Sequence, residues 1–173
     1  MIRNFPIHDE QHAPEAARPF LAQARRDFGI VPAPLARYAS SPLMLRTALM
    51  NLEAFESSSL APLEREVLAM TLGHENGCGF CVALHKRRLA ALDAPAPLAR
   101  ALERSGPLPD ERLETLRQFI LNALARRGAV DGPLFEAFIA RGFTHEQALD
   151  VLLGVSVYTL TTFANRLTEA ADA

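Results

Sequence analysis

Residues 62–85 have the sequence PLEREVLAMTLGHENGCGFCVALH, and this stretch decides the fold. Its first part, up to about His74, repeats apolar residues at helical spacing, and leucines on the opposite side make it apolar nearly all round. A helix of that kind is buried inside a protein. Residues 75–77 (Glu-Asn-Gly) then break the pattern, and a second helix is expected from near Cys78 to about Leu92. The stretch therefore predicts two consecutive helices joined by a tight turn.

The helical period continues on both sides of this stretch, without strand-like alternation or hairpin signals. Gly29 ends one predicted helix, Ser41 followed by proline opens another, and Thr144 with Gln147 fits a capping box. Residues 30–34 are expected to form a proline-stiffened connector. The predicted helices cover residues 14–28, 42–56, 62–74, 78–92, a short segment between 97 and 105, 110–127, 131–141 and 144–170. The chain is therefore expected to be a single all-α domain, a bundle of about seven to nine helices.

The second helix of the central stretch carries the chemistry. Cys78, Cys81 and His85 share one stripe of it, because each residue advances the helix by about 100°. Cys81 and His85 are also one turn apart, which makes them neighbours. A C-x-x-C pair lets two sulfurs approach bonding distance, and both the first turn of a helix and a nearby imidazole favour a thiolate. We therefore expect a redox-active dithiol with His85 as a proton-handling group.

The preceding helix supplies a carboxylate. Glu66 lies among apolar neighbours, where a bare carboxylate is costly unless it has a partner. We expect Glu66 to face the cysteine helix as a second proton-handling group, and the alternative is an ordinary acid near a helix N-terminus. Glu64 is expected at the surface, and His74 is expected only to end its helix.

The cysteine pair has other interpretations. Together with His85 and either His74 or Glu66 it could hold zinc, although structural zinc usually recruits two such knuckles. The two cysteines could also be buried and inert. Covalent haem needs a histidine directly after the second cysteine, and Val82 stands there, so haem attachment is excluded.

Composition excludes several functional classes. The net charge is -2, tryptophan is absent and only 7% of residues are aromatic, so we expect neither a nucleic-acid nor a membrane partner. The first residues lack the basic start and apolar core of a signal peptide, and no stretch approaches about 18 uncharged apolar residues. Two cysteines are too few for a disulfide-stapled secreted domain. We therefore expect a cytoplasmic protein.

Glu66, a C-x-x-C pair twelve residues later and then His85 form a combination much more specific than C-x-x-C alone. It resembles the AhpD-like group of alkylhydroperoxidases in the carboxymuconolactone decarboxylase superfamily. Weaker similarity extends to residues 28–32, 41–42, 142–147 and Asn165. The resemblance implies one AhpD-like helical domain over residues 1–173.

The resemblance also implies roles. Cys81 takes the position of the peroxide-attacking thiol, Cys78 that of the resolving thiol, and Glu66 and His85 those of the proton relay. From position alone the order stays open, because Cys78 is nearer the helix N-terminus and Cys81 is nearer His85. AhpD itself has a histidine where Phe80 stands, and its relatives with an aromatic residue there have unknown substrates. No bound cofactor is expected, and a thioredoxin-like or lipoylated protein would supply an external thiol or dithiol reductant.

These observations predict a thiol-dependent peroxidase or disulfide oxidoreductase that reduces hydroperoxides through the Cys78–Cys81 pair in antioxidant defence. The alternatives are a non-catalytic redox-sensing or zinc-holding helical module and, less favoured, a decarboxylase or hydrolase of a small lactone. The resemblance speaks against the last, since the superfamily's decarboxylase branch lacks the cysteine pair.

The last predicted helix, residues 144–170, bears on assembly. It is apolar around nearly its whole circumference, so it is either the central helix of a monomer or the contact of a homo-oligomer. We expect a homo-oligomer with Asn165 and Arg166 near the end of the contact, and the resemblance implies a trimer or hexamer.

Overall fold

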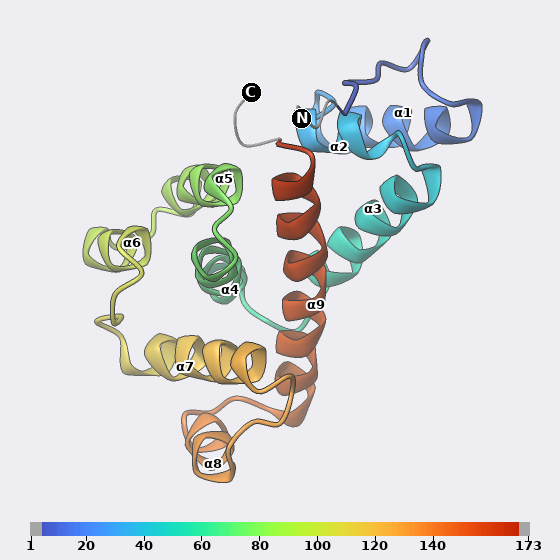
Figure 1. Ribbon diagram of the computed structural model, residues 1–173. Helices are drawn as coiled ribbons and strands as arrows, with labels where there is room; N and C mark the ends of the chain where they lie inside the picture. Colours follow the sequence, from blue (N-terminus) through green and yellow to red (C-terminus); the bar gives the residue numbers. More distant parts are fainter. Residues whose placement is uncertain (1–4, 170–173) are drawn as a thin grey trace.

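A computed structural model describes residues 5–169, and this part of the chain contains helices and no strand. Figure 1 shows α9 standing between α1–α3 on one side and α4–α8 on the other. The elements are the short 3-10 helix η1 (Glu15–Ala17) and the α-helices α1 (Arg18–Phe28), α2 (Ala33–Tyr38), α3 (Pro42–Glu56), α4 (Pro62–Glu75), α5 (Gly79–Ala91), α6 (Ala96–Glu103), α7 (Glu111–Ala125), α8 (Gly132–Ala140) and α9 (His145–Leu167). The predicted all-α class is confirmed.

The helix ends are where capping chemistry places them. The Ser41 hydroxyl accepts the Met44 N–H at the start of α3, and Thr144 and Gln147 form the predicted capping box of α9. Gly29 ends α1 with a φ of 75°, a left-handed conformation that glycine adopts without strain.

One prediction about residues 30–34 is wrong. The connector is shorter than expected, because α2 begins at Ala33. Pro34 lies in the first turn of this helix, where its missing N–H costs nothing. Proline therefore opens a helix here instead of preventing one.

Two apolar clusters fill the structure. The larger one joins the end of α3 to α4–α9 and includes Leu68, Met70 and Ile120. The smaller one joins η1 and α1–α3 and includes Leu21 and Leu45. Helix α9 borders both clusters, since it packs on α3, α4 and α7. The N-terminal helices and the cysteine helix are therefore connected through α9.

Helix α4 is buried almost all round, as its sequence predicts. Helix α9 passes so close to α3 and α4 that a Cβ built on Gly154 would lie 2.5 Å from Phe55 of α3 and 2.7 Å from Leu68 of α4. Any larger residue here would force these side chains to shift, so glycine allows α9 to pack closely against the helix that carries Glu66.

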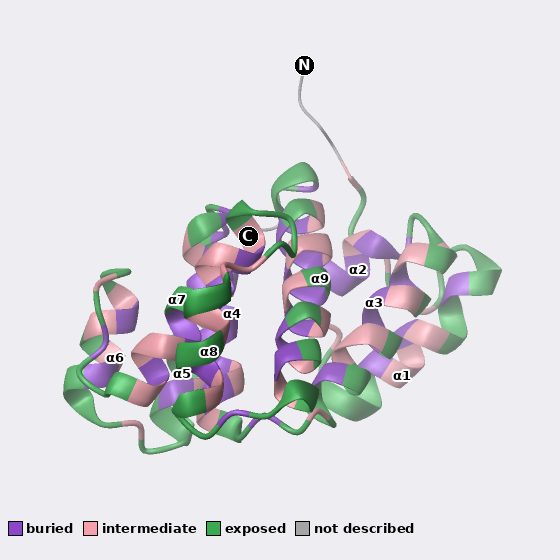
Figure 2. Cartoon of the chain, turned by 90° about the horizontal axis from the view of Figure 1, so that it is seen from below, coloured by how far each residue is buried: buried purple, intermediate pink, exposed green. Residues whose placement is uncertain are grey.

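Helix α9 is long and apolar enough to cross a membrane, by length and composition alone. The mean hydropathy of its most apolar window is 1.3, and 39% of that window is buried inside the protein. Figure 2 shows exposed as well as buried positions along it. Its buried residues include Thr161, Thr162 and Asn165, whose polar groups bond inside the protein. These contacts bind the C-terminal half of α9 to the rest of the bundle.

Candidate functional site

The turn between α4 and α5 places both cysteines. Gly77 takes a φ of 64°, and the Cys78 N–H donates to the Gly73 carbonyl, so the chain reverses within a few residues. The end of α9 holds this turn: the Asn76 amide donates to Thr162 Oγ1 at 2.9 Å, and Arg166 Nη1 donates to the Asn76 carbonyl at 2.9 Å.

Cys78 is the N-cap of α5. Its Sγ accepts a hydrogen bond from the backbone N–H of Cys81 at 3.3 Å. The hydroxyl oxygen of a serine N-cap makes the same contact. Both sulfurs belong to free thiols, and both residues are buried. The dithiol therefore lies at the positive end of a helix, inside the protein.

The amide of Asn165 faces both sulfurs. Its Nδ2 lies 3.3 Å from Cys81 Sγ and 3.6 Å from Cys78 Sγ. Its Oδ1 accepts from the hydroxyl of Tyr38, which lies at the end of α2. A buried polar chain therefore runs from α2 through α9 to the cysteines.

The two thiols differ in acidity. The pKa of Cys78 falls from its ordinary value of 9.0 to about 6, chiefly because the Cys81 thiol donates a hydrogen bond to it, with further help from the Cys81 N–H, Asn165 and Arg166. The pKa of Cys81 rises because it is the donor of that bond and is buried beside the same charge. Cys78 is therefore the more acidic of the two thiols, and Cys81 is the one that keeps its proton more firmly.

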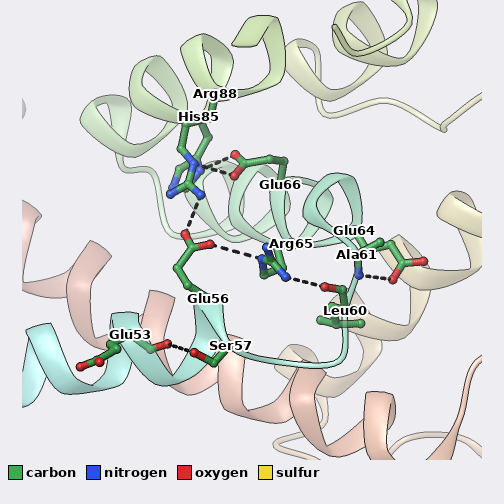
Figure 3. Close-up of polar contacts among 10 residues, drawn as sticks. All are labelled: Glu53, Glu56, Ser57, Leu60, Ala61, Glu64, Arg65, Glu66, His85 and Arg88. Atoms are coloured by element: carbon green, nitrogen blue, oxygen red, sulfur yellow. Dashed lines mark hydrogen bonds and ion pairs between the residues drawn. The ribbon is translucent and has the colours of Figure 1, made fainter. Parts of the chain in front are cut away.

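Glu66 is buried and has a partner on each oxygen. Its Oε2 lies 2.7 Å from His85 Nδ1, and its Oε1 lies 2.8 Å from Arg88 Nε. Arg88 in turn contacts Glu56 at 2.5 Å, which extends the network from the buried carboxylate to the surface (Figure 3). The charge of Glu66 is thus compensated inside the protein, which is the condition for burying it.

The ring of His85 packs edge-on against Tyr158 of α9, with the ring centres 5.2 Å apart. Its Nδ1 is engaged by Glu66, which leaves Nε2 as the nitrogen able to exchange a proton. Among residues 5–169, no hydrogen bond joins His85 to either sulfur. Cys81 and His85 remain neighbours one turn apart on α5.

The predicted residues Glu66, Cys78, Cys81 and His85 therefore lie on two adjacent, packed helices, α4 and α5. The prediction for Glu64 is wrong: it is buried, because one oxygen accepts the Ala61 N–H and the other pairs with Arg112. A carboxylate in the first turn of a helix that is buried all round has no solvent side to face.

Three further residues belong to the site but are not predicted as site residues from the sequence. Arg88 lies one turn beyond His85, a spacing that could have suggested a partner for Glu66. Tyr38 and Asn165 are far from the cysteines in sequence, and only the packing of α2 and α9 brings them in. The expectation that Asn165 lies at an oligomer contact is wrong, because this residue is buried against the dithiol.

The described residues contain no group of three or more histidine, cysteine or acidic side chains that could hold a metal ion. In this structure Nδ1 of His85 faces Glu66, at 2.7 Å.

No protein-family model and no curated protein matches this sequence. Solved structures do match. An uncharacterized peroxidase-related protein from Ralstonia eutropha JMP134, described as an alkylhydroperoxidase AhpD core, is 21% identical with a TM-score of 0.79, over 94% of this chain and 88% of the other. This chain has an AhpD-like fold.

Two further structures share the AhpD-like fold. An uncharacterized peroxidase-related protein from Silicibacter sp. TM1040 is 22% identical with a TM-score of 0.74, covering 97% of this chain and 87% of that one. A cysteine-to-alanine variant of the debrominase Bmp8, in complex with 2,3,4-tribromopyrrole, is 13% identical with a TM-score of 0.75, covering 95% and 89%. The fold predicted from the sequence resemblance is confirmed, and at these identities the likeness concerns the fold alone.

Proposed function

We propose that this protein is a thiol-dependent oxidoreductase that reduces hydroperoxides or disulfides through the Cys78–Cys81 pair. One observation carries the proposal: a buried dithiol caps a helix N-terminus and shares one proton, with the pKa of Cys78 lowered to about 6. Low-pKa thiolates at helix N-termini are reactive, whereas cysteines in purely apolar surroundings have a raised pKa and are inert. The two peroxidase-related neighbours of the same fold agree with this assignment.

The reaction proceeds in two steps on a hydroperoxide ROOH. The Cys81 thiol gives its proton to His85, and its sulfur attacks the terminal oxygen, so the O–O bond breaks and Cys81 becomes a sulfenic acid. The leaving alkoxide takes the proton from His85 and departs as ROH. The Cys78 thiolate then attacks the Cys81 sulfur and expels hydroxide, which takes a proton from solvent and leaves as water, and a Cys78–Cys81 disulfide remains. An external dithiol reduces this disulfide by exchange.

Glu66 and His85 serve the proton transfers. Because Nδ1 of His85 is bonded to Glu66, the proton moves through Nε2, and the carboxylate stabilises the imidazolium formed in between. Arg88 compensates the second oxygen of Glu66, so the carboxylate stays oriented toward the histidine.

We assign the two cysteines different roles: Cys81 attacks the peroxide, and Cys78 resolves the sulfenic acid. Cys78 is the more acidic thiol and is suited to resolve a sulfenic acid, whereas Cys81 is the neighbour of His85. Cys78→Ser should therefore still consume one equivalent of peroxide and stop at a sulfenic acid that a dimedone probe labels. The Cys81→Ser variant should react with peroxide no faster than a free thiol peptide does. If instead Cys81→Ser forms the sulfenic acid and Cys78→Ser reacts slowly, Cys78 is the attacking thiol.

The proposal extends to partners. The reductant is an external thiol or dithiol, such as a thioredoxin-like or lipoylated protein, in the reducing cytoplasm, where a lone cysteine pair stays available for turnover. The reaction requires no bound cofactor, because both electrons come from the two thiols.

A substrate and donor panel tests the function. Hydrogen peroxide, cumene hydroperoxide, a disulfide and 2,3,4-tribromopyrrole would each be offered with dihydrolipoamide, thioredoxin or glutathione as donor. Turnover on a peroxide or disulfide that both single serine variants lose supports the proposal. Turnover that survives both serine changes contradicts it.

The second candidate is a non-catalytic redox-sensing or zinc-holding module, which the burial of both cysteines favours. Zinc analysis of the reduced, purified protein separates the two. Stoichiometric zinc together with no turnover on the panel would favour the module.

A further inference from the structure

Asn165 has no counterpart in the sequence-based proton relay, yet it is a side chain in hydrogen-bond contact with both sulfurs. It is buried near the end of α9, and its Nδ2 lies within reach of Cys81 Sγ at 3.3 Å and Cys78 Sγ at 3.6 Å. An amide nitrogen carries two N–H groups, so it can donate to both sulfurs at once. Hydrogen bonds donated to an anion favour the charged form.

An asparagine donates only if its amide is turned the right way, since its oxygen and nitrogen are nearly the same size. Tyr38 determines the orientation. Its hydroxyl donates to Asn165 Oδ1 and lies 2.9 Å from the carbonyl of Thr161. With the oxygen held by Tyr38, the NH2 group faces the cysteines.

Tyr38 is suited to this task because it stays a donor. Burial raises the pKa of its phenol above the ordinary value, and the nearby cysteines raise it further. The hydroxyl therefore keeps its proton at any pH at which the dithiol works. Tyr38 also packs in the N-terminal apolar cluster with Leu35 and Leu45, which fixes the ring.

We infer that Asn165 is a catalytic residue that donates to the dithiol and stabilises its thiolate, and that Tyr38 is the positioning residue that orients the Asn165 amide. The same donor serves Cys78 in the resting state and Cys81 when its proton leaves. The inference rests on the proposed function, because a catalytic role for Asn165 requires that the dithiol be catalytic. Its test measures the thiol pKa and does not use turnover.

The experiment measures thiolate absorbance in the ultraviolet against pH in the reduced protein. The variants are Asn165→Leu, Tyr38→Phe and the double variant. Leucine matches the shape of asparagine without its polar atoms, and Tyr38 keeps the Thr161 carbonyl as acceptor when Asn165 is replaced. Thr71→Val is the matched control, because it also removes a buried hydroxyl, one that donates only to the Val67 carbonyl of its own helix.

The expected result is a rise of about one unit in the lower thiol pKa for Asn165→Leu, the size of one hydrogen bond to a charged group. Tyr38→Phe should raise it by part of that amount, and adding Tyr38→Phe to Asn165→Leu should change nothing further, since Tyr38 acts through Asn165. Thr71→Val should leave the curve in place.

Unchanged curves for Asn165→Leu and Tyr38→Phe would overturn the inference, even in a protein that proves to be a peroxidase. Additive shifts in the double variant would overturn the role given to Tyr38. If Asn165→Leu does not fold, as judged by circular dichroism, the Tyr38→Phe curve alone decides, because that variant keeps the ring in place. If the variants show these pKa shifts but the wild-type protein has no turnover, the contact of Asn165 with the thiolate is supported and the proposed function is refuted.

Discussion

His85 and Glu66 form a buried pair across two helices, with Nδ1 and Oε2 2.7 Å apart. The contact joins the helix of the carboxylate to the helix of the dithiol, and Arg88 completes it on the other carboxylate oxygen. A carboxylate with two such partners is oriented as well as charged, which is what a proton relay requires.

Replacing Glu66 with glutamine keeps its size and removes its charge. We expect turnover to fall by roughly ten- to a thousandfold, the range that general acid–base catalysis supplies. Glu64→Gln is the matched control: this acid is also buried on α4, but it pairs with Arg112 and the Ala61 N–H. Steady-state rates per folded protein would decide, and equal rates for the two variants would reduce Glu66 to a structural ion pair.

Thiolate reactivity should follow the low pKa of Cys78. Alkylation by iodoacetamide should rise as the pH increases through about 6 and level off above it, because deprotonation creates the nucleophile. His85→Ala should leave this curve in place, since in the described residues no hydrogen bond joins His85 to a sulfur, while slowing peroxide reduction. A curve that moves upward in His85→Ala would show that the imidazole itself stabilises the resting thiolate.

Adding a methyl group at Gly154, where α9 crosses α4, should make the protein less stable. Gly154→Ala would place Cβ against Phe55 and Leu68, and we expect the free energy of unfolding to fall by about 1–3 kcal/mol, the usual cost of overpacking a core. Gly132→Ala is the control, because nothing lies within 4 Å of its added Cβ. Urea titrations of both variants test this, and equal midpoints would mean that the crossing can widen freely.

The exposed side of α9 should be covered by another copy of the chain. Leu149 is 68% exposed and Phe163 is 56% exposed, and Phe163 lines a groove of about 950 Å³ between α9, α7 and the start of α3. Light scattering at low micromolar concentration should give a multiple of 18.9 kDa, with a trimer or hexamer expected. Phe163→Glu should lower that mass, and a wild-type mass near 18.9 kDa would refute the assembly.

Most of the fold was predictable from local rules. Helix period, the Ser41 and Thr144 caps and the Gly29 stop depend on neighbouring residues, so the sequence shows them directly. Helix α2 was missed because two prolines near its start suggested a connector, although proline suits a first helical turn. The need for glycine at position 154 depends on two other helices and has no local signal.

The site divides in the same way. Cys78, Cys81 and His85 share one helix, so spacing alone brings them together, and the burial of Glu66 followed from the apolar helix around it. The contacts of Tyr38 and Asn165 cross more than 80 residues of sequence and arise only when α2 and α9 pack beside the turn before α5. The surface position predicted for Glu64 failed because its partner, Arg112, comes from α7.

The most direct test is the stoichiometry of one oxidation. Reduced protein without added donor would be mixed with excess cumene hydroperoxide, and peroxide consumption, free thiols and intact mass would be followed together. The account predicts rapid loss of one peroxide and two thiols per chain, with a mass lower by about 2 Da from a Cys78–Cys81 disulfide. Two thiols that stay alkylatable after unfolding, with peroxide consumed no faster than by a free cysteine peptide, would contradict it.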